Sequence, residues 1–130
     1  MFIYQHKVHY YETDRMGVTH HSNYIRIMEE ARVAYLDAIG ASYAAMEAEG
    51  VISPVIEVNG RYFHTTTFDD LLDVSVFVKS MTTFKLKIGY TIHCRGELVF
   101  EGWSLHCFLD KDSRPIPVDG RYPQFKAQLA

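Results

Sequence analysis

The hydrophobic pattern of the chain changes its period at Gly50, from the spacing of a helix to that of strands. Before this point, apolar side chains recur every three or four residues from Tyr24 to Ile39, and Gly40 follows them where a helix-ending glycine belongs. After it, apolar and polar residues alternate in four segments separated by turn residues. One long amphipathic helix and a run of strands must therefore share a core.

Five strands and a second, short helix are expected around this long helix. The predicted strands cover residues 2–11, 55–63, 72–79, 84–95 and 98–109. The short helix is expected over residues 42–49, and Gly60 is expected to mark a β-bulge. The long helix is expected to be capped by Ser22 or Asn23 and to carry an ion pair between Arg26 and Glu30.

The order β-α-β-β-β-β predicts an α+β architecture in which an antiparallel sheet curls around the helix. A length of 130 residues with 48% hydrophobic content suits one domain over residues 1–130. An open sheet has two edges, and a long exposed edge strand favours pairing with a second copy of the chain.

Composition excludes several classes of function. The formal net charge is -3, so there is no global basic surface for nucleic acid or anionic membranes. The apolar runs are too short to span a membrane, and the N-terminus lacks the apolar run of a signal peptide, so we expect a cytoplasmic protein. With a hairpin turn at residues 95–97, Cys94 and Cys107 are out of register, and both are predicted to be reduced.

The stretch from Tyr10 to Tyr24 carries the chemistry. A β-like run ends at Glu12, a turn holds Asp14 and Gly17, and His20-His21-Ser22-Asn23 opens the long helix. A helix N-terminus offers free N–H groups that can hold a carbonyl oxygen, while an ionised aspartate faces the carbonyl carbon. This combination suits acyl transfer, with Asp14 either attacking a thioester directly or activating water.

The pattern Thr13-Asp14-x-x-Gly17-x-x-x-His21-x-Asn23-Tyr24-x-x-x-x-Glu29-x-Ala31-Arg32 resembles the 4-hydroxybenzoyl-CoA thioesterase family. The segments from Phe68 to Val74 and from Arg114 to Pro117 resemble later parts of the same family. The resemblance implies a hotdog fold, dimers that extend the sheet and pair into homotetramers, and active sites at subunit interfaces. It also implies Asp14 as the catalytic carboxylate and the backbone N–H near His21 as the group that polarises the thioester carbonyl.

The remaining residues of the motif have a structural interpretation beside the functional one. Gly17 serves the turn, Ser22 and Asn23 cap the helix and so set the geometry of the N–H donors, and Glu29 either supports the site or pairs with a helix arginine. His20 is expected to be structural or solvent-facing. A metal site of Asp14, His20, His21 and Glu29 is not expected, because no zinc-binding spacing is present.

Coenzyme A is expected as part of the substrate, and no cofactor is required. Its phosphates need local cations, and the candidates lie on the later strands: Arg61, Lys79, Lys85, Lys87 and Arg95. Tyr62, Phe63 and His64 could line an acyl pocket, but residues of this kind more often belong to the core or an interface.

The sequence thus predicts an acyl-CoA thioesterase that releases a free acid and CoA. The thioester could also be carried by an acyl-carrier protein. Two alternatives use the same fold: hydration or dehydration of an enoyl thioester, and a non-catalytic module that binds acyl thioesters. The nature of the acyl group is left open.

Overall fold

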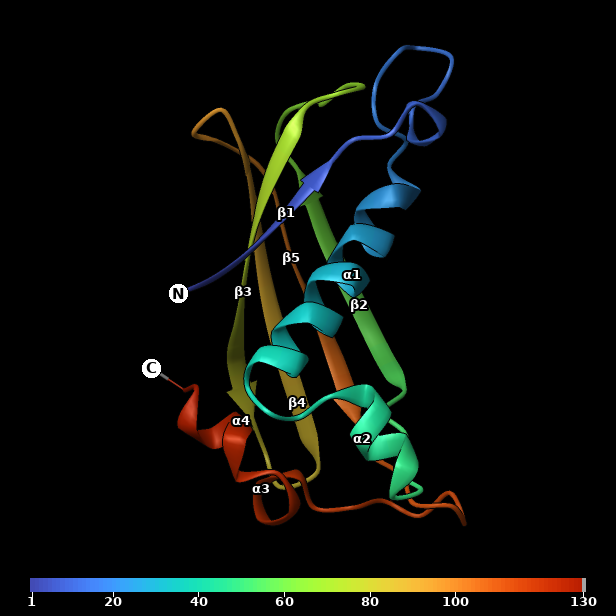
Figure 1. Cartoon of the computed structure of the whole chain (residues 1–130), viewed down its shortest axis with the longest axis vertical. Helices are drawn as coiled ribbons and strands as arrows, with labels where there is room; N and C mark the ends of the chain where they lie inside the picture. The colour runs from blue at the N-terminus through green and yellow to red at the C-terminus, as the bar shows by residue number, and fades with distance from the viewer. Residues whose placement is uncertain (130) are drawn as a thin grey trace.

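A computed structural model describes residues 1–129 of the chain. Its elements are β1 (Phe2–Lys7), the 3-10 helix η1 (Tyr10–Glu12), α1 (Ser22–Ala38), α2 (Tyr43–Ala48), β2 (Val55–Tyr62), β3 (Leu71–Met81), β4 (Lys85–Cys94), β5 (Glu97–Cys107), α3 (Val118–Arg121) and α4 (Pro123–Ala127). The strands form one antiparallel sheet in the order β1-β3-β4-β5-β2, and α1 lies across one face of it (Figure 1). This confirms the predicted α+β hotdog fold.

The core lies between α1 and the inner face of the sheet. As the alternation predicted, Leu86, Ile88, Tyr90, Ile92 and Cys94 of β4 all point inward and are buried. The helix presents a matching stripe of buried side chains, namely Ile27, Met28, Ala31 and Tyr35. Complete burial of each large apolar side chain contributes about 1.5–3 kcal/mol, so this contact fixes α1 on the sheet.

The first strand is shorter than predicted, because β1 ends at Lys7 and residues Tyr10–Glu12 form a 3-10 turn. The predicted bulge at Gly60 is also wrong, since the irregularity of β2 lies between Val55 and Glu57. Gly60 serves packing instead. A Cβ atom there would lie 2.8 Å from the ring of Phe100, which is fully buried beneath it.

The β4–β5 hairpin turns on two residues, Arg95 and Gly96, whose φ angles of 51° and 77° suit the mirror-image turns of tight hairpins. Glu97, which we predicted in the turn, instead pairs with Cys94. Cys107 pairs with Lys85, as expected, and both cysteines are free. Arg95 does not extend the basic row on β4, because its Nη1 donates to Asp70 Oδ1 at 2.7 Å.

The chain ends in two short helices that the sequence did not predict. They follow the proline-containing segment after β5 and lie at the end of the sheet opposite the loop that precedes α1 (Figure 1). Val118, Tyr122 and Phe125 are buried, and the rings of Tyr122 and Phe125 pack against Phe108. These helices close the core at that end.

Within residues 1–129, neither edge of the sheet is paired with a further strand. β1 forms one edge and β2 the other, and every residue of β2 except Gly60 is exposed. In residues 1–129 there is no helix with the length and apolar character needed to cross a membrane.

Candidate active site

Asp14 begins a tight turn that its own groups close. Its backbone N–H donates to the carbonyl of Val18 at 2.9 Å, and its carbonyl accepts from the N–H of Gly17 at 3.0 Å. Its Oδ1 accepts from the N–H of Met16 at 2.8 Å. Gly17 has a φ of +80°, a left-handed conformation that favours glycine. The half-buried carboxylate therefore has one oxygen fixed, and its Oδ2 accepts from no group of residues 1–129.

The loop formed by residues 13–21 is anchored to the segment between β2 and β3. Thr19 donates its N–H to the carbonyl of Thr66 at 2.7 Å, and Thr67 Oγ1 donates to the carbonyl of Gly17 at 2.6 Å. The Thr66 hydroxyl also contacts the hydroxyls of Thr19 and Tyr24. The sequence analysis missed Thr66. The run of three threonines directly after the aromatic end of β2 is the signal that could have pointed to it.

The start of α1 differs from the predicted cap. His21 occupies the cap position, and the side chains of Ser22 and Asn23 do not cap the helix. Ser22 Oγ lies 2.8 Å from His20 Nδ1, and Asn23 Nδ2 donates to the carbonyl of Glu12 at 2.8 Å. These side chains are withdrawn from the helix end because the residues before it compete for them. His20, which we expected to be structural or solvent-facing, contacts Ser22 and lines a hollow together with Asp14.

The backbone N–H groups at this end are not equally occupied. The N–H of Asn23 donates to the carbonyl of His20, and that of Ser22 donates to the ring of His20. The N–H of His21 donates to no atom within residues 1–129. A free donor thus lies at the positive end of the α1 dipole, where a developing oxyanion is stabilised.

Asp14 and His21 line the same hollow, which we name the first hollow, with a volume of about 310 Å³. Its other walls are mostly apolar or aromatic and comprise Met16, Val18, Thr19, Tyr24, Tyr62, Phe63, His64 and Thr65. Tyr62 Oη donates to the carbonyl of His21 at 2.9 Å and so holds the cap residue in place. Tyr62, Phe63 and His64, the candidates for an acyl pocket, therefore line the same hollow as Asp14.

Asp14 also lines a second, more polar hollow of about 530 Å³. Glu12, Asn23, Arg26 and Glu30 contribute to its walls. Asp14 is thus common to a mostly apolar hollow and a more polar one.

The structure does not bring Glu29 to the site. Glu29 is exposed on α1 and lines neither hollow. The predicted pair of Arg26 and Glu30 is wrong, since Arg26 Nη1 donates to Asn23 Oδ1 at 3.1 Å, whereas Glu30 Oε2 accepts from Tyr4 and contacts His6. Glu30 is therefore held by residues of β1, and Arg26 by a residue one turn earlier on α1, in place of the predicted ion pair.

The basic residues proposed for CoA phosphates are separate from both hollows. Arg61 and Lys79 line a hollow of about 370 Å³ with Trp103. The Nζ atom of Lys87 lies 4.2 Å from the centre of the Trp103 ring. Lys85 lines a different, largely apolar hollow, so the structure groups only part of the predicted set.

A chain of buried polar groups connects α1 to the sheet. Arg32 donates to the hydroxyls of Tyr43 and Tyr90, the Tyr90 hydroxyl contacts Ser104 Oγ at 2.7 Å, and Ser104 Oγ contacts His106 Nε2 at 2.7 Å. Burial, together with the charge of Arg32, lowers the pKa of His106 to about 3. The ring is therefore neutral, and its Nδ1 has no partner within residues 1–129.

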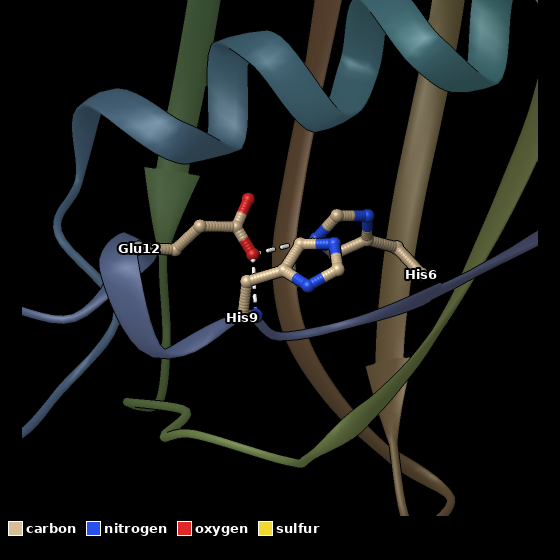
Figure 2. A group of neighbouring side chains, drawn as sticks. All are labelled: His6, His9 and Glu12. Atoms are coloured by element: carbon tan, nitrogen blue, oxygen red, sulfur yellow. Dashed lines mark hydrogen bonds and ion pairs between the residues drawn. The ribbon is translucent and has the colours of Figure 1, made fainter.

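One group of side chains in the described residues brings together donor atoms suited to a metal ion, and it is not the set considered from the sequence. His6, His9 and Glu12 each place one such atom within 4.8 Å of the others (Figure 2). Asp14, His20, His21 and Glu29 form no such group in residues 1–129.

A carboxylate and a free N–H at a helix start, sharing one hollow on a sheet wrapped around that helix, are the parts expected of a thioesterase. The family profile of the thioesterase-like superfamily matches residues 8–129. The chain belongs to this superfamily. The resemblance drawn from the motif between Thr13 and Arg32 is thereby confirmed.

Several known proteins are similar to the chain over nearly its full length. YneP of Bacillus subtilis (strain 168), which carries a provisional name as an acyl-CoA thioesterase, is 35% identical over 121 residues, 92% of this chain and 88% of YneP. The hypothetical protein TT1821 of Thermus thermophilus superposes with a TM-score of 0.92 at 30% identity and covers 98% of each chain. The DHNA-CoA thioesterase of Staphylococcus aureus gives 0.88 at 32% identity over 97% of this chain and 86% of its own.

Proposed function

We propose that the protein hydrolyses acyl-CoA thioesters at the first hollow. Water adds its oxygen to the carbonyl carbon, the carbon–sulfur bond breaks, and the products are a free acid and the CoA thiol. The single observation that carries the proposal is that Asp14 and His21, whose N–H is free within residues 1–129, line one hollow at the N-terminus of α1. Asp14 acts there as nucleophile or general base, and the N–H stabilises the oxyanion.

The walls of the first hollow suit an acyl group. Tyr24, Tyr62 and Phe63 supply aromatic surface, while the unoccupied Oδ2 of Asp14 is available to water or to the carbonyl carbon. Arg61 and Lys79 are our candidates for phosphate contacts, because they supply two cations at one hollow beside Trp103.

The test measures free thiol release from aromatic and straight-chain acyl-CoAs. Asp14→Asn should lower kcat by about 10²- to 10⁴-fold, since a neutral amide neither attacks nor takes a proton. Asp37→Asn, at an exposed position of α1 outside both hollows, is the matched control and should retain the full rate. Equal rates for wild type and Asp14→Asn would contradict the assignment, and loss of an enoyl chromophore without thiol release would favour a hydratase.

We also propose that two copies pair through β2 to form a homodimer. Seven of the eight residues of this edge strand are exposed, and it ends at Tyr62, so a partner copy would lie beside the first hollow. Sedimentation at micromolar concentration should give a dimer or a larger symmetric assembly. A monomer alone would contradict the pairing.

A further inference from the structure

His6 of β1 lies between two carboxylates that come from different elements. Its Nε2 lies 2.8 Å from Glu12 Oε1, at the end of η1, and its Nδ1 lies 3.0 Å from Glu30 Oε2, on α1. The side chains of His6 and Glu12 are only 4–5% exposed. Figure 2 shows the Glu12 carboxylate reaching the His6 ring and the backbone nitrogen of His9. No part of the proposed reaction uses this group.

Each carboxylate oxygen that contacts His6 has a second partner. Glu12 Oε1 also accepts from the N–H of His9 at 2.7 Å, and Glu30 Oε2 also accepts from the hydroxyl of Tyr4 at 3.1 Å. The ring of His6 is therefore the centre of a hydrogen-bonded group that joins β1, η1 and α1.

The contacts of His6 are to carboxylates on one side of the ring and the other, and its register neighbour on β3 is the apolar Leu72. Hydrogen bonds to charged carboxylates are about twice as strong as neutral ones, so the two contacts form a strong link.

Direct hydrogen bonds between His6 and the carboxylates fit this geometry better than coordination of a metal ion by His6, His9 and Glu12. Two histidines and a carboxylate are a common ligand set for zinc, but tetrahedral ligands at about 2.0–2.1 Å from the ion lie roughly 3.3 Å apart. The 2.8 Å between His6 Nε2 and Glu12 Oε1 is a hydrogen-bond length, and the second nitrogen of His6 is engaged by Glu30. The ring of His9 is exposed and stacks on Tyr11.

The group holds the base of the loop that carries Asp14. The carbonyl of Glu12 accepts from the N–H of His20 at 2.8 Å and from Asn23 Nδ2 at 2.8 Å. The same residue therefore joins the two ends of the loop through its backbone and reaches His6 through its side chain. Glu30, two turns further along α1, completes the link to the helix whose start carries the His21 N–H.

We propose that His6, which bridges Glu12 and Glu30, is a positioning residue that fixes the Asp14 loop against the start of α1. The inference rests on the proposed thioester hydrolysis at Asp14. Loss of either contact of the His6 ring releases the loop base or the helix.

Three variants test the proposal. In His6→Gln the amide can donate to one carboxylate while its oxygen faces the other, so kcat should fall by about 10- to 100-fold through misplacement of Asp14, with KM changed less than threefold. The double variant His6→Gln/Glu30→Gln restores two hydrogen bonds without charge, because the new amide on α1 can donate to the amide oxygen of the new side chain on β1, and should recover most of the rate. His9→Gln keeps the backbone N–H to Glu12 and should behave as wild type.

Hydrogen exchange separates positioning from general folding. Exchange of the loop amides, His20 above all, should accelerate in His6→Gln and return to the wild-type rate in the double variant. This readout does not depend on catalysis.

The outcomes distinguish the two ideas. A His6→Gln variant with wild-type kcat and wild-type exchange would overturn the positioning role, as would a double variant no better than the single one. Stoichiometric Zn²⁺ binding that is lost in both His6→Gln and His9→Gln would show that a metal ion, and not a hydrogen-bonded His6, joins these side chains. A wild type that releases no thiol would overturn the proposed function, while faster exchange in His6→Gln, reversed in the double variant, would still support the positioning of the loop.

Discussion

Two polar regions of α1 are built in opposite ways. At its N-terminus, Asp14 keeps one carboxylate oxygen unoccupied and His21 keeps its N–H unoccupied within the described residues, and both lie beside a hollow. Beneath its middle, Arg32 begins a buried chain that runs through Tyr90 and Ser104 to His106.

Exposure explains the difference. At the hollow, water can satisfy a free donor or acceptor until a substrate replaces it, so an unoccupied group costs little stability. In the interior, an unpaired polar atom costs about 1–3 kcal/mol, so the side-chain groups from Arg32 to His106 Nε2 are paired with one another, and only His106 Nδ1 at the end of the series has no partner within residues 1–129. The comparison predicts that changes at the helix start alter catalysis with little effect on stability, and that changes beneath the helix do the reverse.

The largest test of this division removes the central hydroxyl of the buried chain. Ser104→Ala leaves His106 Nε2 without a partner and takes one from the Tyr90 hydroxyl, at a residue with 0% exposure. We expect a loss of about 3 kcal/mol in the free energy of unfolding, measured by urea denaturation. The rate per folded molecule should be unchanged. Ser80→Ala, at an exposed position of β3, is the control, and a large fall in kcat for Ser104→Ala would break the division.

The pH dependence of stability gives a somewhat smaller test. Folding lowers the pKa of His106 from 6.5 to about 3. Between these pH values the histidine is protonated in the unfolded chain and neutral in the folded one. Stability from this residue is therefore complete above pH 6.5 and declines as the pH falls from 6.5 towards 3. Between pH 6.5 and 4.5 the decline should be about 2 kcal/mol.

The corresponding variant is His106→Gln, because glutamine has no titratable side chain. It should lose about 2 kcal/mol less stability than wild type over the same pH interval, whatever its stability at neutral pH. Ser80→Ala, at an exposed position of β3 and without a titratable group, should keep the wild-type slope. Identical slopes for wild type and His106→Gln would mean that the buried ring accepts a proton in the folded state.

The sequence predicted best what depends on periodicity and on local motif. The alternation of β4 specified which side chains face the core, and the spacing of Asp14, Gly17 and His21 specified a turn before a helix. Both features are encoded within a few neighbouring residues, so they can be predicted without knowledge of the tertiary contacts.

Predictions failed where distant groups compete for the same atom. Ser22 and Asn23 are good caps by type, yet His20 and the carbonyl of Glu12 engage them instead. Glu30 is well spaced to pair with Arg26, yet His6 on β1 engages it. Such choices depend on which elements meet, and that is fixed only when the sheet closes around α1.

The smallest expected effect concerns the hydroxyl of Tyr62. The ring of this residue is part of the aromatic wall of the first hollow, and its hydroxyl is a hydrogen-bond partner of the helix start. Tyr62→Phe removes the 2.9 Å hydrogen bond to the carbonyl of His21 and keeps the ring that contacts Tyr24 and Phe100. Without this bond the His21 N–H should be held less firmly, and kcat should fall about 2- to 10-fold, which corresponds to about 0.4–1.4 kcal/mol in the activation free energy. Because Tyr62 is exposed, the melting temperature should change little. Tyr122→Phe removes a buried hydroxyl that has no partner within residues 1–129 and should leave kcat unchanged. If Tyr62→Phe lowered stability and left kcat intact, the hydroxyl would belong with the buried chain, and the orientation of the His21 peptide would have to be set by α1 alone.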